Sequence, residues 1–157
     1  ELKGNVKLDN IIQKDENGSK IVDMPKFLKE YATEFIYLFE QIYKYKNINE
    51  IDNEYTKTIL TYNFGNNLRK FLEIYLFFKY PQEQSLGVKT IERFFGSTQY
   101  ASLINRYVHE FSHLSGSLER GMKPPVIPES KKIAEFVLET IQKKDPEQYE
   151  ALCESIN

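Results

Sequence analysis

The segment LRKFLEIYLFF, residues 68–78, decides the fold, because most of its residues are apolar and recur at helical spacing. We predict a helix that starts at Glu54 and ends before Pro81, since a residue that precedes proline disfavours helical geometry. Gly65 is expected to break or kink this helix. A helix with so much apolar surface is usually buried, so we expect it near the centre of the fold.

The N-terminal flank predicts a hairpin followed by a long helix. Residues 1–23 alternate weakly between apolar and polar side chains and pass through a polar turn cluster, which favours a lead-in with a short hairpin. Asp23 suits the N-cap of an amphipathic helix that ends near Tyr45, with Pro25 in its first turn. Residues 47–53 are polar and predict a loop. The apolar stripe of the helix consists of Phe27, Leu28, Tyr31, Phe35, Leu38, Phe39 and Ile42.

The C-terminal flank predicts two helices directly after the central one. Residues 82–87 form a loop in this scheme, and residues 88–95 form a short helix that Gly96 closes. Ser97 suits the N-cap of a longer helix over residues 98–115.

The last part of the chain predicts a loop and two further helices. Glycines and prolines interrupt residues 116–128, residues 129–143 regain helical spacing, and Asp145-Pro146 starts a short final helix that ends near Cys153 or Ser155. We therefore predict an all-α fold, a compact bundle of about five to six helices. In this division residues 1–23 are a lead-in and residues 24–157 form the helical domain.

Composition limits the classes of function. The chain has 157 residues, enough for one domain with a core, and a net charge of −2. The net charge therefore does not indicate nucleic-acid binding, and binding of RNA would depend on a local basic patch. Cys153 has no disulfide partner, and no apolar run approaches the roughly 20 residues of a membrane span, so we expect a cytoplasmic protein. Because Glu1 stands where an initiating Met would, we expect more chain before it.

Both histidines fall within residues 104–114 and allow three interpretations. His109-Glu110-x-x-His113 has the spacing that binds Zn²⁺ on one helix face, with the Glu as general base. Such a zinc needs a third ligand, for which the chain offers Glu119, Glu129, Glu135 and Glu139. In the second interpretation the histidines are packed, hydrogen-bonded structural residues. The third is a metal-free ribonuclease.

A metal-free ribonuclease needs an imidazole, a guanidinium and a group that orients them. The imidazole deprotonates the RNA 2′-hydroxyl, and the guanidinium neutralises the charge that grows on the phosphate. Arg69 and Glu73 share one helix face, with Asn66 one turn earlier. Taken alone, their spacing favours an ordinary exposed ion pair worth roughly a few tenths of a kcal/mol, but the apolar residues on both sides leave little room for a fully solvated face. The residues that supply all three groups are Arg69, Glu73, Arg106, His109 and His113.

Several stretches, in the same order, resemble the C-terminal region of a bacterial AAA/ABC-type ATPase family. This family includes the RloC and PrrC anticodon nucleases and related phage-defence ATPases. The resemblance implies that residues 1–23 lead in from a preceding ATPase domain. The stretches are DMPKFLKEYATEFIYLF (23–39), NLRKFLE (67–73) with FFKYP (77–81), INRYVH (104–109) and DPEQY (145–149).

The same resemblance implies a HEPN-like helical ribonuclease with an Arg-x-x-x-Glu element and a His. Arg69 and Glu73 match the element, His109 is the first choice for the His, and His113 is the second. The broader HEPN signature, an Arg followed by a His, would instead select Arg106 and His113, with Tyr107 where a polar residue usually follows the Arg. The implied RNA-binding residues are Asn66, Asn105 and Arg106.

The implied partners are RNA, such as a tRNA anticodon loop, the ATPase domain of the same polypeptide, and a second copy in a homodimer. No metal and no membrane are implied. The chain has no G-x-x-x-x-G-K-[ST] loop, so ATP and Mg²⁺ are expected in the missing ATPase part. Two alternatives remain: a non-catalytic helical module that couples the ATPase to a partner effector, and a zinc metallopeptidase through His109-Glu110-x-x-His113.

Overall fold

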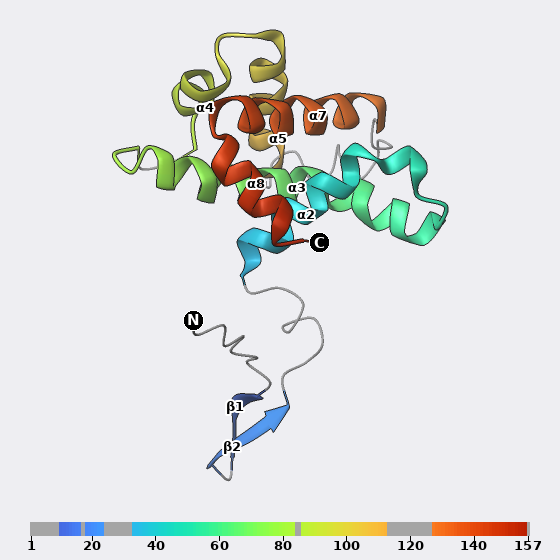
Figure 1. The fold of residues 1–157 in the computed structure, drawn as a ribbon, viewed down its shortest axis with the longest axis vertical. Coiled ribbons are helices and arrows are strands. Elements are labelled where there is room, and N and C mark those ends of the chain that lie inside the picture. Colours follow the sequence, from blue (N-terminus) through green and yellow to red (C-terminus); the bar gives the residue numbers. More distant parts are fainter. Residues whose placement is uncertain (1–9, 17, 24–32, 84–85, 113–126, 157) are drawn as a thin grey trace, which may run out of the picture. The chain divides into compact units, whose positions relative to one another are not determined.

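The computed structural model describes residues 10–16, 18–23, 33–83, 86–112 and 127–156 (Figure 1). The chain divides into two compact units, Glu1–Glu34 and Phe35–Asn157. Each unit is described below by itself.

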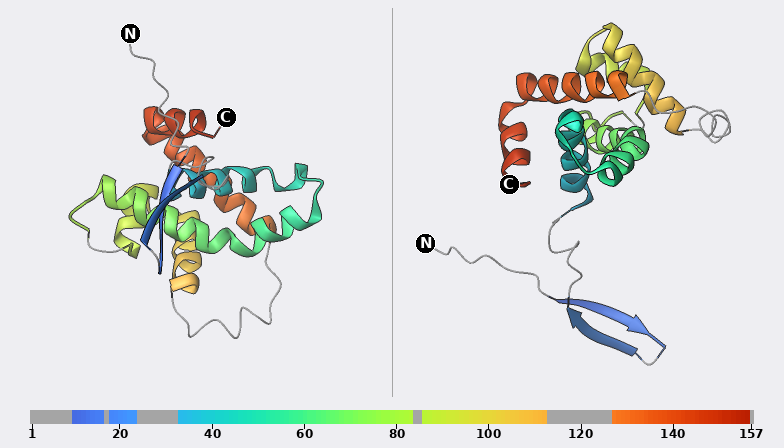
Figure 2. Two further views of the ribbon diagram at one scale, coloured as in Figure 1. Left: turned by 90° about the horizontal axis from the view of Figure 1, so that it is seen from below. Right: turned by 90° about the vertical axis from the view of Figure 1, so that its right-hand side faces the viewer.

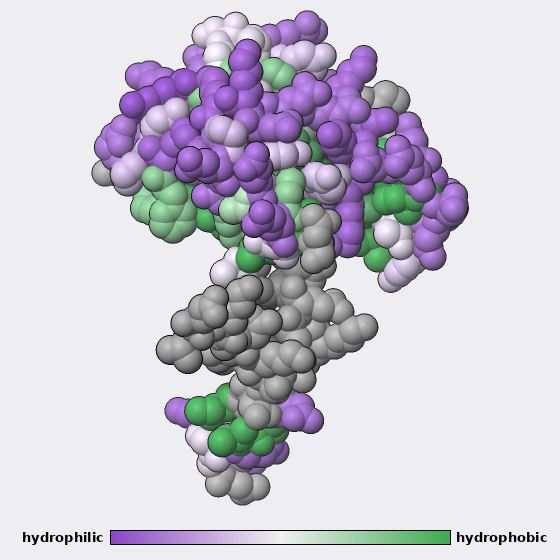
Figure 3. Space-filling model, in the orientation of Figure 1, coloured by the Kyte–Doolittle hydropathy of each residue, from purple (hydrophilic) through white to green (hydrophobic). Residues whose placement is uncertain are grey.

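The first unit contains an antiparallel hairpin of β1 (Asn10–Asp15) and β2 (Gly18–Asp23). Gly18 has a φ of +129°, a conformation that glycine adopts readily. Ile12 pairs with Ile21, and both side chains are 73% exposed. Figure 3 accordingly shows hydrophobic residues on the surface of the hairpin. The predicted hairpin is confirmed.

The helical unit begins with α2 (Glu34–Lys46), which buries Leu38, Phe39 and Ile42 as the predicted stripe requires. Asp23 is the last residue of β2, so the structure does not show it as a helix N-cap, and residues 24–32 of the predicted helix lie outside the described residues.

Residues 47–53 are more ordered than the predicted loop. They contain the 3₁₀-helix η1 (Ile48–Glu50), and the side chain of Ile48 is completely buried. The prediction was wrong because the polar neighbours concealed one apolar anchor.

The central helix α3 (Glu54–Lys79) has 26 residues and is capped by Asn53, whose side chain accepts a hydrogen bond of 2.8 Å from the backbone N–H of Thr56. It continues through Gly65, so of the predicted break or kink the break is wrong. The neighbouring Phe64 and Leu68 are both buried, and their packing outweighs the cost of about 1 kcal/mol of a glycine inside a helix.

Aromatic rings join α3 to α2. Phe71 stacks on Phe35 at 5.1 Å between ring centroids and lies 6.0 Å from Phe39. Tyr45 stacks on Phe64 at 4.3 Å. The segment that includes Phe71 therefore lies in the core, as predicted.

The next two helices follow the predicted order. α4 (Val88–Phe95) ends at Gly96, whose φ of +81° favours glycine. α5 (Gln99–Ser112) packs against both α3 and α4. Its cap is Thr98 and not the predicted Ser97, because Oγ1 of Thr98 accepts the hydrogen bond of 3.1 Å from the N–H of Ala101. Residues 113–115 of the predicted helix lie outside the described part of the chain.

The last two helices are α7 (Ile127–Lys144) and α8 (Pro146–Glu154). α7 packs against α3 and α5, and the chain turns sharply from α7 into α8 (Figure 2). Pro128, predicted to lie in the loop, belongs to the first turn of α7, where proline costs no hydrogen bond. The described residues form six α-helices, which confirms the all-α bundle, and none of these helices is long and apolar enough to cross a membrane.

Candidate functional site

Arg69 and Glu73 form an ion pair on the outer side of α3, with 2.5 Å between Nη1 and Oε1. Residues four apart in a helix lie one turn above each other, so their side chains can meet. Leu68 and Leu72, which precede them, are completely buried and anchor the backbone beneath the pair. The two charged side chains are 21% and 41% exposed. The pair thus lies at the boundary of core and solvent.

The guanidinium of Arg69 is not saturated by Glu73. Its Nε is buried and has no hydrogen-bond partner among the described residues. A guanidinium carries five N–H donors in a planar fork that matches carboxylate and phosphate oxygens. Arg69 therefore retains donors beyond the one that Glu73 occupies.

The predicted RNA-binding residues lie in different environments. Asn66 is half-buried on α3, whereas Asn105 is only 9% exposed on α5. Oδ1 of Asn105 is buried without a hydrogen-bond partner in the described structure. Arg106 is half-exposed and forms an ion pair of 2.5 Å with Glu129 of α7. Arg106 thus links α5 to α7.

His109 is exposed near the end of α5, next to the buried Val108. Because α5 packs against α3, the two helices that carry His109 and Arg69 are in direct contact. His113 lies outside the described residues. The structure therefore gives a position for the first-choice histidine only.

The zinc motif is described only in part, since His113 and the side chain of Glu110 lie outside the described residues. Within the described ranges, no three His, Cys, Asp or Glu side chains gather as a metal site. Among the suggested third ligands, Glu129 pairs with Arg106, and Glu135 lies 3.7 Å from Lys131.

A hydroxyl contact joins α5 to α7 beside Arg106. Oη of Tyr107 lies 2.8 Å from Oγ of Ser130. Burial raises the pKa of Tyr107 and of Tyr45, although the nearby Ser130 hydroxyl opposes the rise. The Tyr107 hydroxyl therefore stays neutral, and its contact with Ser130 joins the two helices. This contact could not be predicted from the sequence, because Ser130 resembles an ordinary polar residue at a helix start.

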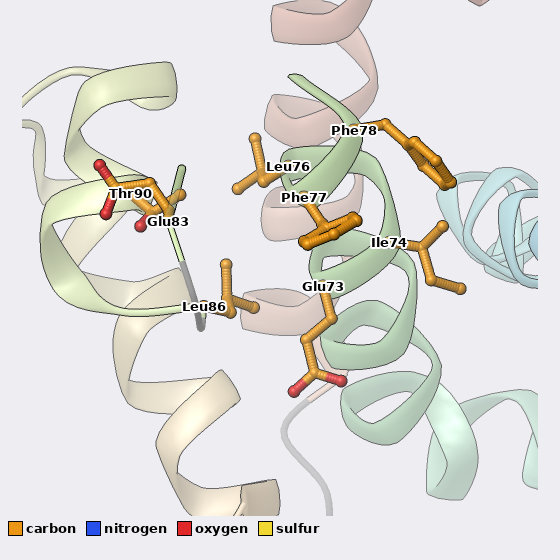
Figure 4. Close-up of a pocket in the computed structure, with 8 residues that line it drawn as sticks. All are labelled: Glu73, Ile74, Leu76, Phe77, Phe78, Glu83, Leu86 and Thr90. Carbon is orange, nitrogen blue, oxygen red and sulfur yellow. The ribbon is translucent and has the colours of Figure 1, made fainter. Parts of the chain in front are cut away.

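A pocket of about 400 Å³ opens beside the ion pair, and Glu73 belongs to its wall (Figure 4). α3 supplies one side, and the loop before α4 with α4 itself supplies the other. Phe77 and Phe78 are 51% and 77% exposed, so they are not core residues. Glu83 forms an ion pair of 3.6 Å with Arg93. The remaining lining residues are Ile74, Leu76, Leu86 and Thr90.

Sequence reasoning missed this pocket because Phe77 and Phe78 belong to the apolar run of α3. A signal was present, however. The buried residues Leu68, Phe71, Leu72, Tyr75 and Leu76 follow the helical period, and Phe77 and Phe78 fall outside it.

Comparison with known proteins gives one match. A family model described as an AAA domain matches residues 5–139, most of the chain. No curated protein and no solved structure matches the chain.

Proposed function

The chain belongs to the AAA domain family, and we propose that its helical unit is a metal-free, HEPN-like ribonuclease of a bacterial phage-defence ATPase. The substrate is RNA, such as a tRNA anticodon loop, as the resemblance to the anticodon nucleases implies. The residues present do not fit ATP, because the sequence has no G-x-x-x-x-G-K-[ST] loop. No step of the reaction below involves a nucleotide.

The accessible Arg69–Glu73 pair is the observation that carries the proposal. Glu73 contacts Nη1 and fixes the guanidinium, while the Arg69 side chain stays 21% exposed, so a second anion can reach it. A phosphodiester is such an anion, and Arg binds it through two parallel hydrogen bonds. Arg69 is therefore the phosphate clamp, and Glu73 is its orienting partner.

His109 supplies the proton transfer. Its imidazole accepts the proton of the 2′-hydroxyl, the 2′-oxygen attacks phosphorus, and the bond from phosphorus to the 5′-oxygen breaks. The 5′-oxygen leaves and takes a proton from solvent water, and the His109 imidazolium releases its proton to solvent. The products are a 2′,3′-cyclic phosphate and a 5′-hydroxyl. Arg69 stabilises the extra negative charge on the phosphate during this step. His113 is the second choice for the base, and with Arg106 it forms the alternative pair.

The test is cleavage of 5′-labelled tRNA anticodon stem-loops in the presence of EDTA. Arg69→Ala and His109→Ala are expected to slow cleavage by about 10²- to 10⁴-fold, the usual contribution of a general base or a charge-stabilising group. Glu73→Gln is expected to slow it less, because the amide still accepts a hydrogen bond. The products should carry 2′,3′-cyclic phosphate ends.

Lys131→Ala is the matched control, because Lys131 and Glu135 form an ion pair with the same spacing on α7. Its cleavage rate should equal that of the wild type. Cleavage that depends on His113 and Arg106 but not on Arg69 would select the alternative pair. Cleavage that survives substitution of Arg69, Arg106, His109 and His113 by Ala, or that EDTA abolishes, would contradict the proposal.

A non-catalytic module that couples the ATPase to a partner is the second candidate. It is favoured by the large apolar side chains that α3 exposes, since exposed apolar surface often marks an interaction site. Under this alternative no RNA is cleaved, and Arg69→Ala changes nothing except stability. The exposed residues are Tyr55, Ile59, Tyr62, Phe77 and Phe78.

A further inference from the structure

The pocket beside Glu73 has no task in the reaction described above. Its volume of about 400 Å³ falls in the range of small-ligand sites. Its wall combines exposed aromatic surface with two carboxylates, and one of these, Glu73, also holds Arg69. A ligand in this pocket would therefore touch the same side chain that orients the phosphate clamp.

Phe77 offers a ring on which a flat ligand can stack. The ring is half-exposed and is held edge-to-face against Phe78, at 5.7 Å between centroids and 75° between planes. In Figure 4 Phe77 lies between Glu73 and Leu76, and Phe78 lies above and to the right of it. Unpaired nucleobases commonly stack on such rings in proteins that bind single-stranded RNA.

The two carboxylates determine which base fits. Glu73 and Glu83 contact their arginines through Oε1, at 2.5 Å from Arg69 and 3.6 Å from Arg93. A carboxylate accepts several hydrogen bonds and donates none. Bases with an exocyclic amino group, above all cytosine, can donate to it, whereas uracil presents carbonyl oxygens. Because each carboxylate is paired with an arginine, the pocket does not repel the phosphates of the strand.

We propose that this pocket binds one unpaired nucleobase that carries an exocyclic amino group, adjacent to the phosphate that Arg69 holds. Phe77 stacks on the base, and Glu83 accepts a hydrogen bond from its amino group. This inference rests on the proposed ribonuclease function and specifies how its substrate is selected. Phe77 and Glu83 select the base, and they take no part in the chemistry.

Binding is measured with fluorescent 2′-O-methyl oligonucleotides, which lack the attacking hydroxyl and cannot be cleaved. Fluorescence anisotropy on the full chain gives the dissociation constants of oligo(C) and oligo(U). The wild type should bind oligo(C) about 5- to 100-fold more tightly than oligo(U), the range for one well-recognised base.

Two substitutions test the parts separately. Phe77→Ala should weaken oligo(C) binding by about 5- to 100-fold, the range for one stacked base, and Phe77→Tyr should restore it. Glu83→Gln should narrow the preference for oligo(C), because an amide also donates to the carbonyls of uracil. Tyr55→Ala is the control, because Tyr55 is 75% exposed on the first turn of α3, far from the pocket.

The outcomes separate this inference from the ribonuclease proposal. Equal binding of oligo(C) by the wild type and Phe77→Ala overturns the base pocket, even if Arg69 and His109 prove necessary for cleavage. Failure of the wild type to bind either oligonucleotide also overturns it. Binding that depends on Phe77, without cleavage of natural RNA, supports the pocket and overturns the ribonuclease.

Discussion

One carboxylate oxygen of Asp145 accepts hydrogen bonds from two side chains of α3. Oδ2 lies 2.8 Å from Oη of Tyr75 and 2.8 Å from Nζ of Lys79. Asp145 stands between α7 and α8, so these bonds tie both helices to the centre of the bundle. The hydrogen bond from Lys79 lowers the pKa of Asp145 below its ordinary value of 3.8, although burial opposes the shift.

This shift makes the contact sensitive to acid. A carboxylate with a lowered pKa in the folded state stabilises the fold above its unfolded-state pKa, about 4, and the contribution is lost as pH falls through the folded-state pKa. Asp145→Asn should therefore lower the free energy of unfolding by about 1 kcal/mol at pH 7, a modest value because the side chain is 33% exposed.

Thermal unfolding at a series of pH values measures this effect. The difference between the wild type and Asp145→Asn should shrink below about pH 4. Asp52→Asn, at an exposed position, should follow the wild type throughout. A difference that is the same at pH 3 and pH 7 would show that the charge of Asp145 has no role.

Single residues of the candidate site could be predicted only where both partners lie on one helix. The contact of Arg69 and Glu73 follows from their spacing, and the structure contains it. The ion pair of Arg106 with Glu129 and the approach of Glu83 to the pocket join separate elements. Such contacts depend on tertiary packing, which local periodicity does not encode.

At the scale of elements, Asn53 determines where α3 begins. Its side chain satisfies the N–H of Thr56, which has no partner inside the helix. Asn53→Ala should lower the free energy of unfolding by about 1 kcal/mol. Asn53→Asp should retain the stability, because Asp also caps and its charge favours the helix N-terminus.

Chemical denaturation followed by circular dichroism provides the measurement. Asn63→Ala is the control on the same helix, since Asn63 is exposed and its Nδ2 only donates back to the carbonyl of Ile59. This variant should be neutral or slightly stabilised, because Ala is the better helix former. An equal loss in both variants would exclude a capping role.

Helices could be predicted wherever apolar residues recur at helical spacing over a long segment, or where a glycine or proline marks the end or start of the helix. The helix Val88–Phe95 closes at Gly96, and the last helix begins at Pro146, as predicted. The prediction failed at Gly65 and Ile48, where single residues gave a local signal that tertiary burial overrides. The choice between Ser97 and Thr98 as cap was equally open, because adjacent hydroxyls have the same propensity.

At the scale of the whole molecule, the core belongs to the second unit. Among the described residues, every buried apolar side chain comes from residue 38 or later. The helical unit should therefore fold without the hairpin. Removal of residues 1–23 is expected to change the midpoint of thermal unfolding by only a few degrees, because none of the described side chains in this segment is buried.

Circular dichroism at 222 nm and calorimetry would check this prediction. Leu68→Ala in the shortened chain is the positive control. Leu68 is completely buried, so this change should cost about 2–5 kcal/mol and lower the midpoint clearly. A shortened chain that lacks a cooperative transition would show that the hairpin unit is needed for folding.

Because the Arg69–Glu73 pair lies in the middle of α3, its backbone becomes ordered when the chain folds and not when a ligand binds. The backbone there belongs to a continuous helix with a buried inner face, so it has little freedom left to lose when a ligand arrives. Ordering one residue of a loop costs about 1–2 kcal/mol of conformational entropy. For Arg69 this entropy cost is part of the free energy of folding and not of the free energy of binding. An anion that reaches the guanidinium therefore meets a group already aligned by its neighbour, and its interaction energy goes almost entirely into affinity.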